Sequence, residues 1–140
     1  MKEDYVMRTA INSPEYHVPI DGFSQLIPVE GGTRLLLLSG LTSRSFEGEV
    51  VALGDMRGQA AQIMSNMKHI LAEAGASLDD VVQIRTYITD ITRWSEVESV
   101  WKGCWGEVWP VSTMVQISRL FDVRQLIEIE AVAAIPSNRS

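Results

Sequence analysis

Two carboxylates near the C-terminal end of the chain, Glu128 and Glu130, have the clearest potential for acid–base chemistry. They alternate with apolar residues in residues 126–133, so in a strand both carboxylates point to one face. Residues 109–118 alternate in the same way and direct Ser112 to one side of a second strand. Together the two strands could form the wall of a site or the solvated face of a half-buried sheet. The alternation alone favours the solvated face, because antiparallel sheets commonly keep one polar side.

Other catalytic machinery is missing from the sequence. It has no glycine-rich phosphate loop, no dinucleotide-binding glycine motif and no C-x-x-C pair. The two histidines, His17 and His69, have no nucleophile or second ligand nearby in sequence, and the single cysteine, Cys104, is expected to pack as a small core side chain. We therefore expect no metal and no cofactor, and either a carboxylate-based site with Glu128 as the best-placed acid or no catalysis.

Length and composition indicate one globular domain that spans residues 1–140. The chain has 46% hydrophobic and 21% charged residues, which is ordinary for a folded domain. Its net charge of −6 gives no basic footprint for nucleic acid. The longest apolar run, residues 35–38, is too short to span a bilayer, and the first residues do not resemble a signal peptide. We expect a soluble, cytoplasmic protein that contacts neither nucleic acid nor membrane.

The first half of the chain predicts strands followed by a helix. Residues 5–10 and 23–29 are typical of short extended segments, and Gly31-Gly32 predicts a hairpin. Residues 33–39 contain a run of four leucines, which predicts a strand buried on both faces and ended by Gly40, and a loop is expected over residues 41–53. A helix is then expected between an N-cap at Asp55 and a terminating Gly75, because apolar residues recur at three- and four-residue steps.

The second half predicts a strand, a helix and two more strands. Residues 81–89 alternate, with Arg85 and Tyr87 on one face. Ser95 and Glu98 have capping-box spacing for a helix that ends near residue 106. This order predicts an α+β fold in which two helices cover one face of a mixed sheet. The other face would carry Tyr87, Val132 and Met114 among polar groups, which suits self-association.

Several segments carry a resemblance to the RidA family, also called the YjgF/YER057c family. It covers nearly the whole chain, in order and with compatible spacings. The matching segments are Gly22-Phe23-Ser24-Gln25, Leu38-Ser39-Gly40, Gly54-Asp55-Met56 with Gln59, residues 70–82, Tyr87-Ile88-Thr89-Asp90, Pro110, Arg119-Leu120 and residues 127–133.

The resemblance implies a fold, an assembly and an activity. The fold is a chorismate-mutase-like α+β domain. The assembly is a homotrimer with helices outside, sheets facing the axis and three clefts between subunits. The activity of the best-known members is hydrolysis of reactive enamines and imines such as 2-aminoacrylate, which releases ammonia without a cofactor.

The same resemblance assigns cleft residues and exposes departures from the deaminase pattern. Glu128 matches a cleft glutamate that holds or activates water, and Ser39 and Gly40 line the cleft. The deaminating members have an arginine, which binds the substrate carboxylate, at the position of Ser112. The other departures are Met114 for a frequent cysteine, Phe23 for a cleft tyrosine and Glu98 for an asparagine.

Loss of this arginine leaves three functional interpretations. The first is a divergent hydrolase that acts on a small imine or enamine without the usual carboxylate. The second is a non-catalytic trimer that binds a small metabolite. The third, a ribonuclease or translation inhibitor, is disfavoured by the acidic charge balance. Arg85 or Arg119 could supply the missing charge from elsewhere, and Arg85 is the better placed of the two.

Overall fold

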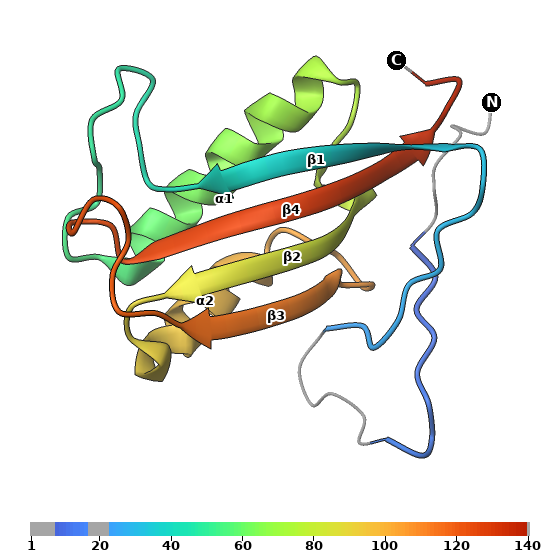
Figure 1. Cartoon of the computed structure of the whole chain (residues 1–140), viewed down its shortest axis with the longest axis horizontal. Helices are drawn as coiled ribbons and strands as arrows, with labels where there is room; N and C mark the ends of the chain where they lie inside the picture. The colour runs from blue at the N-terminus through green and yellow to red at the C-terminus, as the bar shows by residue number, and fades with distance from the viewer. Residues whose placement is uncertain (1–7, 17–22, 140) are drawn as a thin grey trace.

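The protein folds as one mixed sheet with helices packed on one of its faces (Figure 1). The computed structural model describes residues 8–16 and 23–139. Within these residues the sheet has four strands in the order β1-β4-β2-β3. The elements are β1 (Thr33–Leu41), α1 (Met56–Glu73), the 3-10 turn η1 (Leu78–Asp80), β2 (Val81–Ile88), the 3-10 turn η2 (Ile91–Arg93), α2 (Trp94–Trp101), β3 (Val111–Gln116) and β4 (Ile127–Pro136). The expected α+β class is therefore confirmed.

The C-terminal strand β4 lies at the centre of the sheet and pairs antiparallel with both β1 and β2. On its other side β2 pairs with β3 in parallel, which makes the sheet mixed. The edges of the sheet are therefore β1 and β3. Consequently the two polar strands identified in the sequence are not neighbours, because β2 lies between them.

Helix α1 forms as its apolar periodicity predicts. The side chain of Asp55 caps it by accepting a hydrogen bond of 2.9 Å from the Gly58 amide. After the helix, Gly75 adopts a φ of 73°, a left-handed conformation that glycine tolerates without strain. The side chains of Met64 and Met67 are buried in the core, whereas His69 is exposed.

The hydrophobic core lies between the helices and the covered face of the sheet. Burial of this apolar surface is the main source of the stability of such a domain. Cys104 packs against the core, and burial raises the pKa of its thiol, which suits the expected structural role. The fully buried side chains include Met56, Ile63, Met67, Ile84, Ile88, Trp105, Ile127 and Ile129.

The start of α2 differs from its prediction. The helix begins at Trp94, one residue before the expected cap, and its N-cap position, Arg93, makes no capping hydrogen bond through its side chain. Ser95 therefore lies inside the helix, and its hydroxyl does not form the predicted capping box with Glu98. The preceding turn η2 is capped instead by Asp90, which accepts a hydrogen bond from the Thr92 amide.

The strands expected before β1 are not found among the described residues. Residues 5–7 of the first expected strand lie outside the described residues, and residues 8–10 do not form a strand. Residues 23–29 form one isolated bridge, Ile11 to Leu26. The turn at Gly31-Gly32 exists, but β1 pairs with β4 rather than with the preceding segment, so the hairpin prediction is wrong.

Strand β1 is an edge strand, and the expectation that it is buried on both faces is wrong. Leu36 and Leu38 pack against the core, whereas Leu35 and Leu37 are 55% and 78% exposed on the opposite face. Gly40 does not end the strand, which continues through a register shift to Leu41. The exposed leucines lie on the face that no helix covers.

Both ends of the described chain are fastened to the turn η1. The guanidinium of Arg8 donates hydrogen bonds to the carbonyls of Leu78 and Val81, at 3.1 and 2.9 Å. From the other end, Arg139 forms an ion pair of 2.6 Å with the buried carboxylate of Asp80. No helix in the described part of the chain is long and apolar enough to cross a membrane.

Candidate functional site

Glu128 lies on the uncovered face of the sheet, half-buried, at the end of β4 nearest to the loop after β1. Its carboxyl group packs directly against Gly40. A Cβ atom at position 40 would lie 2.8 Å from Cδ and 3.0 Å from Oε1 of Glu128. Because this glycine has no left-handed φ, its conformation does not require glycine, but a side chain at this position would displace the Glu128 carboxyl group. The predicted cleft residues Gly40 and Glu128 are therefore brought together.

A row of polar side chains continues from Glu128 along the same face. Tyr87 lies opposite Glu128 in the β2–β4 register and donates a hydrogen bond of 2.5 Å to Glu130. This hydrogen bond is the largest of the effects that raise the pKa of Tyr87, because the bond to the carboxylate favours the protonated phenol. The Tyr87–Glu130 pair was not predicted from the sequence, since it depends on the pairing of β2 with β4.

Ser112 and Met114 lie on the other face of the sheet. In the parallel β2–β3 register Ser112 is opposite Ile84 and Met114 is opposite Thr86, and both partners are buried beneath the helices. Met114 packs against the core. The expectation that Met114 belongs to the uncovered face is therefore wrong. Within one copy, Ser112 and Glu128 also do not form one polar wall, because they lie on opposite faces of the sheet.

The remaining predicted residues occupy three further places. Ser39 is exposed near Gly40 on β1. Phe23 is 42% exposed, and the next residue, Ser24, donates its hydroxyl to the carbonyl of Trp109 at 2.5 Å, just before β3. Glu98 lies on α2 with its side chain 17% exposed, 3.8 Å from the ammonium of Lys102.

Within one copy of the chain, five of the predicted residues thus form two groups at opposite edges of the sheet. Ser39, Gly40 and Glu128 lie beside the edge strand β1, whereas Ser112 and Met114 lie on the edge strand β3. The order β1-β4-β2-β3 separates the two groups by the width of the sheet. A single copy does not bring them into one cleft.

The two arginines considered as substitutes for the missing charge differ in their availability. Arg119 is bound within its own loop, where it donates hydrogen bonds to the carbonyls of Leu120 and Phe121 at 3.0 and 2.9 Å. Arg85 is exposed on the same face as Glu128 and makes no hydrogen bond or ion pair with any residue that the structure describes. Of the two, only Arg85 has a guanidinium without a partner among the described residues.

The described residues contain no group of three or more histidine, cysteine, aspartate or glutamate side chains that could hold a metal ion.

The hollows near the candidate residues differ in size. Gly40 borders one of about 840 Å³ between α1 and the loop that follows β1, with His69 and Phe46 in its lining. A smaller one of about 220 Å³ lies on the uncovered face beside Arg85 and Glu130.

Comparison with known proteins places the chain in a family. The family model described as endoribonuclease L-PSP matches residues 14–135. The chain belongs to the RidA (YjgF/YER057c) family. A RutC family protein of Pyrococcus abyssi is 38% identical over 116 residues, which cover 82% of this chain and 87% of the relative.

Two further RidA-type proteins are similar to this chain, one of them by its crystal structure. A crystal structure of a Rid family protein from Yersinia pestis matches with a TM-score of 0.84 at 27% identity, covering 93% of this chain and 100% of the other. A relative from Dermatophagoides farinae, 27% identical over 125 residues, is named a 2-iminobutanoate/2-iminopropanoate deaminase. The match covers 89% of this chain and 94% of the relative.

Proposed function

We propose that this RidA-family protein hydrolyses a small imine or enamine in a cleft between copies of a homotrimer, with Glu128 as the group that positions and activates water. The contact between Glu128 and Gly40 carries this proposal. Glycine at position 40 leaves the Glu128 carboxyl group in this place, from which any side chain at position 40 would displace it. The deaminase activity in the name of one relative supports the reaction class.

The chemistry requires little beyond one positioned carboxylate. Glu128 accepts a proton from water as the water oxygen attacks the carbon of the C=N bond. The same carboxyl group gives this proton to the nitrogen, which completes a neutral carbinolamine. The carboxylate then takes the hydroxyl proton of the carbinolamine and passes it to the nitrogen as the C=O bond forms and the C–N bond breaks, which releases ammonia. One imine and one water give one carbonyl compound and one ammonia, so the reaction needs no cofactor.

The division of the site between two sheet edges supports an assembly of several copies. If the β1 edge of one copy lies beside the β3 edge of the next, Glu128 and Gly40 face Ser112 and Met114 across the interface. The uncovered face also exposes Leu35, which a partner would bury. We expect the sheets to face the axis and the helices to face outward.

Ser112 decides the class of substrate in this proposal. A serine cannot replace the two parallel hydrogen bonds and the charge of an arginine that binds a carboxylate. The cleft therefore suits an imine or enamine without a carboxylate close to the C=N bond. The same serine favours the second candidate, a trimer that binds a metabolite without catalysis, and the presence of Glu128 favours the enzyme.

Ammonia release from a panel of small imines and enamines, with and without a carboxylate, tests the proposal. We expect turnover of at least one neutral substrate by the native protein, and near absence of turnover with 2-iminopropionate. Glu128→Gln should reduce the rate by a factor of about 100 or more. Glu73→Gln, at an exposed carboxylate at the end of α1, should leave it unchanged.

Two results would contradict the enzyme. Equal turnover by the native protein and Glu128→Gln would remove Glu128 from the chemistry. Binding of a substrate analogue without any turnover across the panel would favour the metabolite-binding trimer. Restoring the charge with Ser112→Arg should extend activity to 2-iminopropionate if the rest of the cleft is intact.

A further inference from the structure

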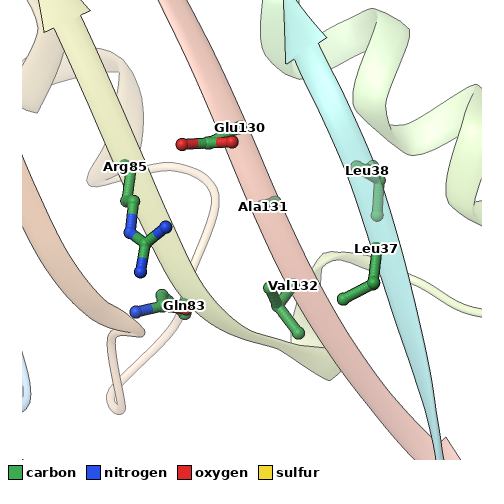
Figure 2. A pocket seen from close by; sticks show the side chains of 7 residues that line it. All are labelled: Leu37, Leu38, Gln83, Arg85, Glu130, Ala131 and Val132. Atoms are coloured by element: carbon green, nitrogen blue, oxygen red, sulfur yellow. The ribbon is translucent and has the colours of Figure 1, made fainter.

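A small pocket on the uncovered face has chemistry that the proposed hydrolase does not use. It has a volume of about 220 Å³ and lies over β2, β4 and β1 (Figure 2). Its polar lining comes from Gln83, Arg85 and Glu130, and its apolar lining includes Leu37 and Val132. Pockets for drug-sized ligands have about 300 to 1,000 Å³, so this one suits a smaller molecule.

The two charged side chains of this pocket, Arg85 and Glu130, have opposite signs and lie across from each other on neighbouring strands. They nevertheless form no ion pair with each other. Arg85 faces Glu130 directly across the β2–β4 ladder, a geometry in which oppositely charged side chains commonly interact. Tyr87 instead donates its hydroxyl hydrogen bond to Glu130. The structure shows no ion pair between Arg85 and Glu130 among the described residues, so the guanidinium retains all its donors for a ligand.

The apolar side of the pocket lies next to these charges. Leu37 is 78% exposed, although its strand pairs with the centre of the sheet. Leu37 and Val132 are opposite each other in the β1–β4 register, and Figure 2 shows their side chains on the same side of the pocket. Together they provide an apolar surface that the described residues of the same copy leave largely open.

We propose that this pocket binds a small zwitterion with an aliphatic side chain, namely an α-amino acid of the size of leucine. Its carboxylate would form paired hydrogen bonds with Arg85, and its ammonium group would meet the oxygen of Glu130 that Tyr87 leaves free. The aliphatic side chain covers Leu37 and Val132, and the Gln83 amide is a further polar contact. Neither a simple anion nor a simple amine would use both charges.

The pocket is close to Glu128 but separate from it. Glu128 is not part of the lining, and it precedes Glu130 by two positions on β4, which is about 7 Å along a strand. In the proposed trimer this face lies toward the axis, so the amino acid would bind on the inner side of the assembly. The inference does not depend on hydrolysis by Glu128.

Calorimetric titration of the full-length protein with L-leucine tests this site. We expect binding to the native protein, with at least a ten-fold loss of affinity in Arg85→Gln and in Glu130→Gln. The amide in Glu130→Gln still accepts the Tyr87 hydrogen bond, so this variant changes the charge and keeps the local structure. Arg57→Gln, at an exposed arginine on α1, is the matched control and should bind as the native protein does.

Truncated ligands test the same idea without a variant. The compound 4-methylpentanoate lacks the ammonium group, 3-methylbutylamine lacks the carboxylate, and glycine lacks the aliphatic part. Each should bind at least ten-fold more weakly than leucine. If 4-methylpentanoate bound as tightly as leucine, Glu130 would have no role in binding, and the proposal that the pocket binds a zwitterion would be wrong.

The two proposals fail in different ways. Glu128→Ala should keep leucine binding while any imine hydrolysis is lost. No leucine binding to the native protein, or unchanged binding to Arg85→Gln, overturns the amino-acid site whatever the outcome for hydrolysis. Binding that is lost in Glu128→Ala and kept in Arg85→Gln would place leucine in the cleft and also overturn it.

Discussion

The two faces of the sheet are built from the same strands and have opposite chemistry. On β4 the covered face presents Ile127 and Ile129, both fully buried, whereas the uncovered face presents Glu128 and Glu130. On β2, Ile84 and its neighbours on the same side pack under the helices. The period of two along a strand therefore gives stability to one face and leaves every candidate acid and base of these strands on the other.

The contrast also shows why polar groups gather where no helix packs. A carboxylate beneath α1 would lose its hydration without a partner, at a cost of several kcal/mol. On the uncovered face, Glu130 keeps access to water and gains the Tyr87 hydroxyl. Function on this fold is therefore expected on the uncovered face or at the sheet edges.

The largest effect should come from shortening a side chain on the covered face. Ile129→Ala should lower the free energy of unfolding by about 2 to 5 kcal/mol, because Ile129 is 0% exposed and its loss leaves a cavity. Leu37→Ala, on the exposed face of the edge strand, should change it by about 0.5 kcal/mol or less in the monomer. Urea unfolding at low protein concentration measures both. Similar losses in the two variants would contradict the division into faces.

On the uncovered face, the strongest effect should be on activity rather than on stability. Gly40→Ala puts a methyl group where the Glu128 carboxyl lies, and the flexible carboxyl is what must move. A displacement of about 1 Å in a catalytic group can reduce a rate about 100-fold, so for the proposed imine hydrolysis we expect a loss of 10- to 100-fold in kcat. Stability should change by less than about 1 kcal/mol.

Gly31→Ala is the matched control for this prediction, because a Cβ atom at Gly31 meets nothing within 4 Å. It should leave kcat and stability unchanged. Adding Glu128→Asp to Gly40→Ala shortens the carboxylate and should restore part of the lost rate. Native kcat in Gly40→Ala would show that the contact has no catalytic role.

A smaller effect should come from the one polar side chain of β2 that points into the core. The hydroxyl of Thr86 is buried and has no hydrogen-bond partner within the described residues. Thr86→Val removes this hydroxyl at constant shape and should stabilise the fold by about 1 kcal/mol. Thr89→Val should do the reverse, because the Thr89 hydroxyl donates to the Leu126 carbonyl at 3.1 Å. Thermal unfolding of both variants checks the signs.

The smallest effect is on the alkaline titration of Tyr87. The pKa of Tyr87 is raised above its ordinary value near 10, chiefly by the hydrogen bond to Glu130. The stabilisation that this bond gives is therefore complete below about pH 10 and is lost as pH rises through the raised pKa. Ultraviolet titration of phenolate, with Tyr87→Phe to assign the signal, should show the pKa fall in Glu130→Gln. An unchanged pKa would mean that the bond is absent in solution.

Local patterns predicted the elements with strong periodicity. The apolar stripe of α1 and its cap at Asp55 are local features, and both formed as expected. The same is true of the two faces of β2, where Arg85 and Tyr87 share a side. In contrast, Ser95 and Glu98 had capping-box spacing, but the helix starts one residue earlier because η2 leads directly into it.

Local patterns could not show which strands pair with each other, or which face of each strand the helices cover. Alternation in β3 showed that Ser112 and Val111 point in opposite directions, but it did not show which of the two faces the helices. The parallel register with β2 decides this, and it puts the serine on the helix side. The exposure of Leu37 has the same origin, since an apolar run is equally compatible with a central strand and with an edge strand that a partner covers.

The fastening of both chain ends to η1 has a consequence for the connectivity of the fold. Arg8 also donates a hydrogen bond of 2.7 Å to the carbonyl of Trp105, and Arg139 binds Asp80, so residues 8 and 139 are both held beside the same turn. Because residues 8 and 139 lie at one turn, the described part of the domain meets the main requirement for circular permutation. A permuted chain with new termini at the exposed residue Gly48, and a linker between the present ends, should keep the same sheet order. Its termini would then lie in the loop after β1 instead of near η1.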